Sequence, residues 1–277
     1  MTTIVDRQRV TAALDEVWDV LFGLAGELDP DDWSRPTACP SWSVQDCYSH
    51  CLGTEALLLD RPLPDVDLPD NLPHVRNDIG RINEVWVTHY RSMSPPEVVA
   101  EFRRAVDERR RALAAMDDAD FLAESFTPAG PDTYGRFMRT RVMDQWMHEQ
   151  DVREAAGRPG HLVGLAPELA LDEVTAALGY VVGKKAALPA GSSVRFELTG
   201  DLARRIDVEV GDRARVVEAL AGTPTVSLTL PGERFMRLCG GRVAADGTVQ
   251  AAADADAHVG GDAELGARLL AELGFMI

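Results

Sequence analysis

The hydrophobic pattern of the chain changes its period near residue 160, and this change constrains the fold more than any other feature. Before that point, apolar residues recur at helical spacing, as they do from Val10 to Leu24. After it, the stretches SSVRFELTG and RRIDVEV alternate like paired strands, and VSLTLP resembles a third strand. The letters GRPG at 157–160 lie between the halves, and Gly and Pro commonly end helices. We therefore predict an α+β fold, with a helical bundle over 1–162 and a small α/β domain over 163–277.

Prolines, glycines and capping residues divide the chain into elements. Ser43 precedes a helical run and has Asp46 three residues later, which is a variant of the capping box. Four prolines in RPLPDVDLPDNLP end that helix near Asp60. The predicted helices span 6–28, 43–60, 79–91, 95–117, 135–156 and 167–187, with a short one at 232–239 and a closing one at GDAELGARLLAEL.

The charge of the chain argues against two classes of partner. Its 277 residues carry a formal net charge of −17, whereas binding to a phosphate backbone requires clustered Lys and Arg. The same excess of acidic residues argues against an anionic membrane surface. The sequence has no apolar run near the roughly 20 residues that span a bilayer, and its first residues lack the apolar core of a signal peptide. We expect a cytoplasmic protein that binds neither nucleic acid nor membrane.

The cysteines do not form a familiar metal-binding or redox motif. They are Cys39, Cys47, Cys51 and Cys239, and no two of them are spaced as C-x-x-C. Cys47 and Cys51 are four residues apart and could approach each other on one helix. In a reducing cytosol, we expect small buried thiols.

The predicted helix over 135–156 carries polar residues on a face that should point inward. Asp144, His148 and Asp151 follow one another at i, i+4 and i+7, so they lie on one side of the helix. Three inward polar groups are costly to bury unless something satisfies them. The opposite side, which we assign to solvent, carries Arg139, Glu149, Gln150 and Arg153.

The helix over 43–60 supplies a complementary histidine. His50 shares its face with Cys47 and Gly53, whereas Glu55 points roughly the other way. Two histidines and a carboxylate from two inward faces match a catalytic zinc site, in which three protein ligands leave the fourth position open. The alternative is an ordinary core histidine held by hydrogen bonds, because D-x-x-x-H also arises by chance.

Two longer motifs resemble a known family. T-x-C-P-x-W-S-V-x-D stands ahead of His50, and W-M-H-E-Q-D-V-R-E-A-x-G-R-P-G includes His148. Together they resemble the mycothiol-dependent maleylpyruvate isomerase family of the DinB-like metalloenzyme superfamily. The resemblance implies an N-terminal four-helix bundle that holds one divalent metal, usually Zn²⁺, and a C-terminal α/β domain of sterol-carrier-like type. It also implies that the metal ligands are His50, Asp144 and His148, although some relatives have a longer glutamate at the first carboxylate position.

The function implied by the resemblance is that of a metal-dependent thiol enzyme. A low-molecular-weight thiol, mycothiol in the family, would bind the open zinc position as a thiolate and attack a small electrophile. In an isomerase it would add to the double bond of a maleylpyruvate-like acid and leave after rotation, whereas an S-transferase would keep the adduct. The same ligands serve both reactions. The alternative is a non-catalytic ligand-binding or regulatory protein of the same fold, and the protein is expected to be a monomer or a homodimer.

Several other residues have a predicted role. Arg242 is the candidate catalytic residue, because its guanidinium suits the carboxylate of an anionic substrate, and Arg234 is a weaker candidate. Asp151 is three residues after His148 and either orients that imidazole or makes a plain buried contact. Trp42 is expected to be a packing anchor and Glu84 a helix-surface carboxylate. Surface roles are expected for the remaining histidines, His74, His89, His161 and His258.

Overall fold

The computed structural model of the protein describes residues 2–128, 130–242 and 256–276. The chain divides into two compact units, Met1–His161 and Leu162–Ile277. The first unit is mainly helical and the second contains a small sheet with helices, so the predicted mixed fold is confirmed. None of the helices among the described residues is long and apolar enough to cross a membrane.

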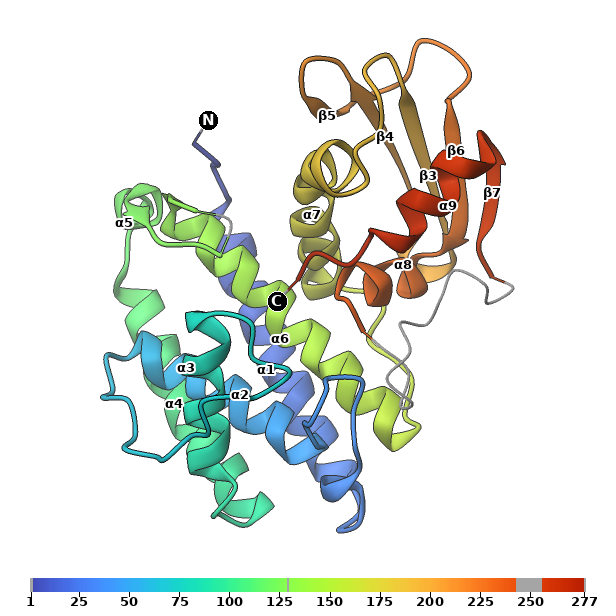
Figure 1. The fold of residues 1–277 in the computed structure, drawn as a ribbon. Helices are drawn as coiled ribbons and strands as arrows, with labels where there is room; N and C mark the ends of the chain where they lie inside the picture. The colour runs from blue at the N-terminus through green and yellow to red at the C-terminus, as the bar shows by residue number, and fades with distance from the viewer. Residues whose placement is uncertain (1, 129, 243–255, 277) are drawn as a thin grey trace. The chain divides into compact units, whose positions relative to one another are not determined.

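The first unit is a four-helix bundle (Figure 1). Its helices are α1 (Arg7–Glu27), α2 (Val44–Leu58), α4 (Pro95–Ala115) and α6 (Tyr134–Ala156). Helix α6 packs against α1 and α2, and α4 packs against the same two helices, which closes the bundle. A further helix, α3 (Asp78–Tyr90), packs on the side of α2. The bundle therefore places α2 and α6 face to face, as the metal-site prediction requires.

Local sequence signals set the ends of the two helices that matter most for the site. Helix α2 begins with a full capping box, in which the Ser43 side chain accepts from the backbone of Asp46 and the Asp46 side chain accepts from the backbone of Ser43. Helix α6 is capped at its start by Thr133, whose side chain accepts from the Arg136 amide, and at its end by Gly157, which has the left-handed conformation. These caps fix where His50 and His148 lie along their helices.

Close packing on α2 depends on a glycine. A Cβ atom added to Gly53 would lie 2.4 Å from Cβ of Trp86 on α3, closer than real Cβ contacts. A side chain at this position would push α3 away from α2. Gly53 therefore allows the Trp86 side chain to pack directly against the backbone of α2.

The second unit is a five-stranded sheet in the order β5-β4-β3-β6-β7. Strands β3 and β6 are parallel, and the other neighbours are antiparallel. The strands are β3 (Ser193–Thr199), β4 (Arg204–Val210), β5 (Ala214–Val217), β6 (Val226–Pro231) and β7 (His258–Gly261). Apolar residues such as Phe196 and Leu228 fill one side, which α7 (Leu165–Tyr180), α8 (Gly232–Cys239) and α9 (Ala263–Ala271) cover. The other side carries ion pairs, such as the one between Arg195 and Asp207.

The predicted elements agree with the structure except for the short ones and one helix end. Each predicted helix is present, with ends that differ by a few residues. The helix predicted to run to residue 187 leaves the α-helical pattern at Tyr180 and continues as a π-helical turn, Val181–Lys185. Elements of two to five residues were not predicted, because so few residues carry no periodicity. They are α5 (Asp118–Leu122), β1 (Glu124–Ser125), β2 (Asp132–Thr133), β5, β7 and two 3₁₀ turns, η1 (Asp32–Ser34) and η3 (Gly200–Leu202).

Candidate metal centre

The three predicted metal ligands meet between α2 and α6. Nε2 of His50 lies 3.1 Å from Oδ2 of Asp144, and Nε2 of His148 lies 3.7 Å from Oδ1 of the same carboxylate. One donor atom from each residue lies within 4.8 Å of the other two. Both imidazoles are buried, whereas the Asp144 side chain is 29% exposed. The structure thus brings together two nitrogens and an oxygen, with access from one side.

The electrostatics of the three residues differ because their neighbours differ. Burial lowers the pKa of His50, although Asp144 opposes that effect. Burial also disfavours the charged form of His148, yet hydrogen bonds with Asp151 and Cys39 outweigh it and raise the pKa to about 9. Burial would raise the pKa of Asp144, but Arg141 and the imidazoles hold it well below its usual range. The Asp144 carboxylate is therefore ionised and the His50 imidazole neutral at neutral pH, the charge states in which both can bind a metal.

A buried carboxylate orients the second histidine. Oδ2 of Asp151 lies 3.1 Å from Nδ1 of His148, and Asp151 is fully buried. This contact leaves Nε2 of the same ring facing Asp144. A carboxylate that holds the far nitrogen of a ligating histidine fixes its tautomer and raises its basicity. Of the two roles predicted for Asp151, the contact matches the orienting one.

Arg141 connects the centre to a buried ionic network that sequence analysis missed. Its guanidinium donates to Asp144, to Thr54 and to Glu55. Glu55 also accepts from Arg109 at 3.0 Å, in a pair that is almost completely buried. Glu55 therefore serves as the counter-charge of two arginines, consistent with its exclusion as a ligand. The available signal was the position of Arg141 three residues before Asp144, on the same helix face.

Trp42 packs beside both histidines and is held in place by Glu84. The Trp42 ring centroid lies 5.2 Å from that of His50 and 5.6 Å from that of His148. Nε1 of Trp42 donates to Glu84 at 2.9 Å, and Glu84 also binds His74 and Arg91. The prediction of a surface role for Glu84 is wrong, because the residue is only 2% exposed. The physical reason is that the segment carrying His74 and the loop carrying Trp42 both contact this helix.

The solvent face assigned to α6 is also wrong. Glu149 is fully buried, and Gln150 is nearly so. The segment after the helix contacts this face, where Trp146 Nε1 donates to the His161 carbonyl. His161, predicted at the surface, lies instead between Glu149 at 2.6 Å and Glu16 of α1 at 3.0 Å. A helical wheel could not show a face covered by residues that follow the helix.

Two cysteines lie on the far side of His148. Sγ of Cys39 lies 3.1 Å from Oδ2 of Asp151 and 3.9 Å from Nδ1 of His148. Cys47 completes a second group whose donor atoms all lie within 4.8 Å of one another. All four cysteines are free, and Cys47, Cys51 and Cys239 are buried as predicted.

The remaining predicted residue, Arg242, belongs to the second unit. It follows α8, and its guanidinium donates to the Gly240 carbonyl at 2.9 Å. This contact holds the side chain close to the C-terminal end of α8. Its role in gripping an anionic substrate stays a prediction.

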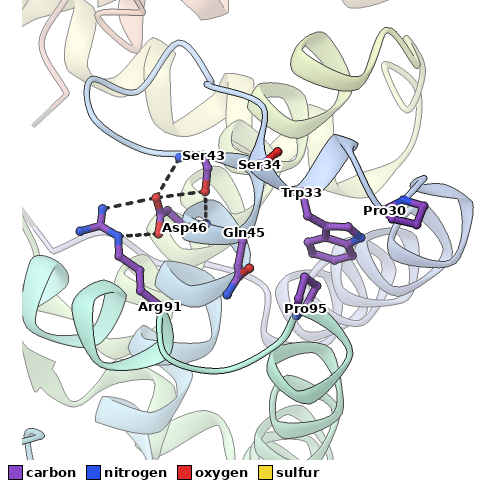
Figure 2. Close-up of a pocket in the computed structure, with 8 residues that line it drawn as sticks. All are labelled: Pro30, Trp33, Ser34, Ser43, Gln45, Asp46, Arg91 and Pro95. Carbon is purple, nitrogen blue, oxygen red and sulfur yellow. Dashed lines mark hydrogen bonds and ion pairs between the residues drawn. The ribbon is translucent and has the colours of Figure 1, made fainter.

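A pocket of about 370 Å³ lies near the beginning of α2 (Figure 2). Figure 2 shows Asp46 hydrogen-bonded to Ser43 and to Arg91 inside it. These polar groups already satisfy one another, and Gln45 donates to the Met93 carbonyl. The lining residues are Pro30, Trp33, Ser34, Ser43, Gln45, Asp46, Arg91 and Pro95. The pocket therefore has fewer polar groups available to a ligand than the centre between α2 and α6, which is the better candidate for a functional site.

Comparison with protein families decides the relationship of the chain. The family model described as "Mycothiol maleylpyruvate isomerase N-terminal domain" matches residues 14–153, and the one described as "MDMPI C-terminal domain" matches residues 168–268. The chain belongs to the mycothiol maleylpyruvate isomerase family. Within this family assignment, the first match includes all three candidate ligands, and the second includes the whole sheet.

Individual relatives are more distant. Two proteins of Mycobacterium tuberculosis, both named as uncharacterized, are 27% identical to the chain over 141 residues. That alignment covers 50% of the chain and 53% of each relative, so the chain spans about half the length of these curated relatives. Two crystal structures of the mycothiol-dependent maleylpyruvate isomerase, one of a histidine-to-alanine mutant, have TM-scores of 0.58 and 0.54. They are 13% identical over 87% of the chain and 92% of theirs, so they show the fold alone.

Proposed function

We propose that the chain is a metal-dependent thiol enzyme, whose metal is held by His50, Asp144 and His148. The observation that carries this proposal is the meeting of two imidazole nitrogens and a carboxylate oxygen within 4.8 Å of one another, from two different helices. Membership of the mycothiol maleylpyruvate isomerase family supports the choice of a thiol as cosubstrate.

The donor set fits a zinc ion. Zn²⁺ in catalytic sites takes three protein ligands, commonly histidine and a carboxylate, and keeps its fourth position for water or substrate. Nε2 of His50 and Nε2 of His148 both face the Asp144 carboxylate, so two nitrogens and an oxygen are available to one ion. The partial exposure of Asp144 gives an approach to the centre. When bound, such an ion lowers the pKa of a thiol that coordinates it.

The residues around the ligands orient them and limit water. Asp151 holds the proton on Nδ1 of His148, which leaves Nε2 as the ligand atom. Arg141 holds the Asp144 carboxylate in place through its own contacts with Thr54 and Glu55. Trp42 covers both imidazoles and is fixed by Glu84. A ligand geometry fixed in this way costs less reorganisation when the reaction occurs.

The nucleophile in this proposal is an external thiol and not a cysteine of the chain. Cys47 is fully buried, and its hydrogen bond with Cys39 together with burial raises the pKa of its thiol. A protonated thiol is a poor nucleophile. Mycothiol, the thiol of the family, would supply the reactive sulfur from solution.

We propose cis–trans isomerisation of a maleylpyruvate-like acid, with S-transfer as the alternative outcome of the same first step. The thiol adds to the carbon–carbon double bond, which leaves a single bond that rotates freely. Elimination of the thiol then restores the double bond in the trans form. If elimination does not occur, the adduct is the product of an S-transferase.

The test combines metal analysis with a search for consumed thiol. The purified protein is loaded with zinc and mixed with mycothiol and a panel of electrophiles, including maleylpyruvate. Isomerisation appears as loss of the cis acid at constant free thiol, whereas S-transfer consumes thiol in proportion to product. His50→Ala should abolish either reaction, and His89→Ala, which changes an exposed histidine of α3, should not. A zinc-free protein of normal stability that reacts with no electrophile would contradict the proposal.

A further inference from the structure

His148 faces a different group of donors with each of its ring nitrogens. Nε2 faces Asp144, within the centre described above. Nδ1 faces Asp151 at 3.1 Å and Sγ of Cys39 at 3.9 Å. Cys47 adds a second sulfur to this side, and these four donor atoms all lie within 4.8 Å of one another. Two sulfurs, a nitrogen and an oxygen therefore surround one point.

The distances in this group are close to those of a four-coordinate metal site. Bonds of about 2.3 Å to sulfur and about 2.0 Å to nitrogen or oxygen place the donors of a tetrahedral ion about 3.3–3.8 Å apart. The sulfur–oxygen contact of 3.1 Å and the sulfur–nitrogen contact of 3.9 Å bracket that range. Shifts of a few tenths of an ångström would bring the contacts among Cys39, His148 and Asp151 into this range, and the sulfur of Cys47 lies within 4.8 Å of these donors.

The elements that carry the four residues hold them in place and leave a way in. Cys47 lies on α2, one turn before His50, while His148 and Asp151 lie on α6. Cys39 lies in the loop before α2, where its carbonyl accepts from the Trp42 amide and its own amide donates to Thr37. Cys39 is the partly exposed member of the group, so an ion would enter past it.

We propose that Cys39, Cys47, His148 and Asp151 form a second metal site, selective for thiophilic divalent ions such as Zn²⁺, Co²⁺ and Cd²⁺. Thiolate ligands favour such ions over Mg²⁺ and Ca²⁺. Binding releases one proton from each cysteine to solvent and needs no oxidant or reductant.

The second site competes with the first through the shared ring. An ion bound at Nδ1 of His148 displaces the proton that Asp151 holds there, and it takes Asp151 as a ligand. The first site then loses the contact that orients its second histidine. An excess of a thiophilic ion should therefore weaken binding at His50, Asp144 and His148. This consequence rests on the proposed function, whereas the second site itself does not.

Cobalt absorption tests the site directly, because thiolate ligands give Co²⁺ an intense near-ultraviolet charge-transfer band. The full-length protein, reduced with a phosphine and with its free thiols counted, is titrated with CoCl₂. We expect the band in the wild type, its loss in Cys39→Ser and Cys47→Ser, and its retention in Cys51→Ser, which changes a buried cysteine of the same helix. In His50→Ala the band should appear at lower cobalt concentration, since the competing site has lost a ligand.

The same titration separates failure of this inference from failure of the proposed function. Cobalt binding without the band, or a band that persists in both Cys39→Ser and Cys47→Ser, would overturn the second site. Loss of the band in His50→Ala would also overturn it, because that residue is not among the four ligands. Circular dichroism of each variant shows whether it folds, and Cys39→Ser changes a partly exposed residue and so tests the site even if Cys47→Ser unfolds. A thiolate band in a protein that catalyses no reaction of an external thiol would contradict the proposed function and leave the second site supported.

Discussion

Helix α6 contributes to two clusters of imidazole and carboxylate, one on each side, and only one of them has the features of a metal site. On one face, His161 has a carboxylate at each ring nitrogen, and its partner Glu149 also binds Arg153. On the other face, His148 meets Asp144 and His50, and Nδ1 of His50 has no partner. Burial of a histidine therefore does not by itself indicate a metal site. The proposed site rests instead on the convergence of three donors at one accessible place.

The largest effect on stability should come from the satisfied pair. His161→Ala leaves Glu149 buried with only Arg153 as its charged partner, and breaking a buried pair costs about 3 kcal/mol or more. We expect the free energy of unfolding to fall by that amount, measured by urea denaturation, with metal content unchanged. Because His161 has a left-handed backbone, His161→Gly serves as a control that keeps the backbone relaxed. If His161→Ala lost metal and kept its stability, His161 would belong to a metal site and its proposed structural role would be wrong.

The orienting carboxylate should affect metal affinity next most strongly. Asp151→Asn keeps the shape of the side chain but removes the charge beside Nδ1 of His148. Residues in this position typically change metal affinity by about 10–100-fold. Competition with a chromophoric chelator measures the dissociation constant. Unchanged affinity would show that His148 does not depend on Asp151 for its orientation.

The pH dependence of stability should report the satisfied pair. Burial disfavours the charged form of His161, but Glu149 and Glu16 outweigh it and raise the pKa of the ring. The folded protein then binds more protons than the unfolded chain, whose histidine has a pKa of about 6.5. Its contribution to stability is complete below that value and is lost as pH rises through the folded pKa. The free energy of unfolding of His161→Gln should not show this decline with pH. The difference in unfolding free energy between wild type and variant should therefore shrink as the pH rises, and a difference that does not change with pH would contradict the assignment.

The smallest effect should come from Cys47. This cysteine is not among the proposed ligands of the first site and is not the proposed nucleophile. Cys47→Ser should therefore keep the metal of the first site and retain most of its thiol-dependent activity, because the change removes neither a ligand of that site nor the reacting sulfur. Steady-state rates at saturating external thiol give the comparison. Normal metal binding without turnover would show that the protein's own sulfur takes part in the reaction.

The fold could be predicted from hydrophobic periodicity. The burial of single residues could not be predicted where their contacts come from outside the helix. The inward face of α6 was predicted from Asp144, His148 and Asp151 because spacing on one helix is a local property. The burial of Glu149 depends on His161, and that of Glu84 on Trp42 and His74. These partners lie in loops, and hydrophobic periodicity does not predict the course of a loop. The bridge by Arg141 from Asp144 to Glu55 likewise joins two helices.

The metal content of the His50 and His148 variants shows whether a metal binds between α2 and α6. The otherwise wild-type protein, His50→Ala, His148→Ala and His161→Ala are each purified with Cys39→Ser, which removes a ligand of the proposed second site, and zinc in each is measured by elemental analysis after passage over a weak chelator. We predict about one ion in the first site of the otherwise wild-type protein and of His161→Ala, and loss of that ion from His50→Ala and His148→Ala. Full occupancy in folded His50→Ala and His148→Ala would contradict a metal centre between α2 and α6.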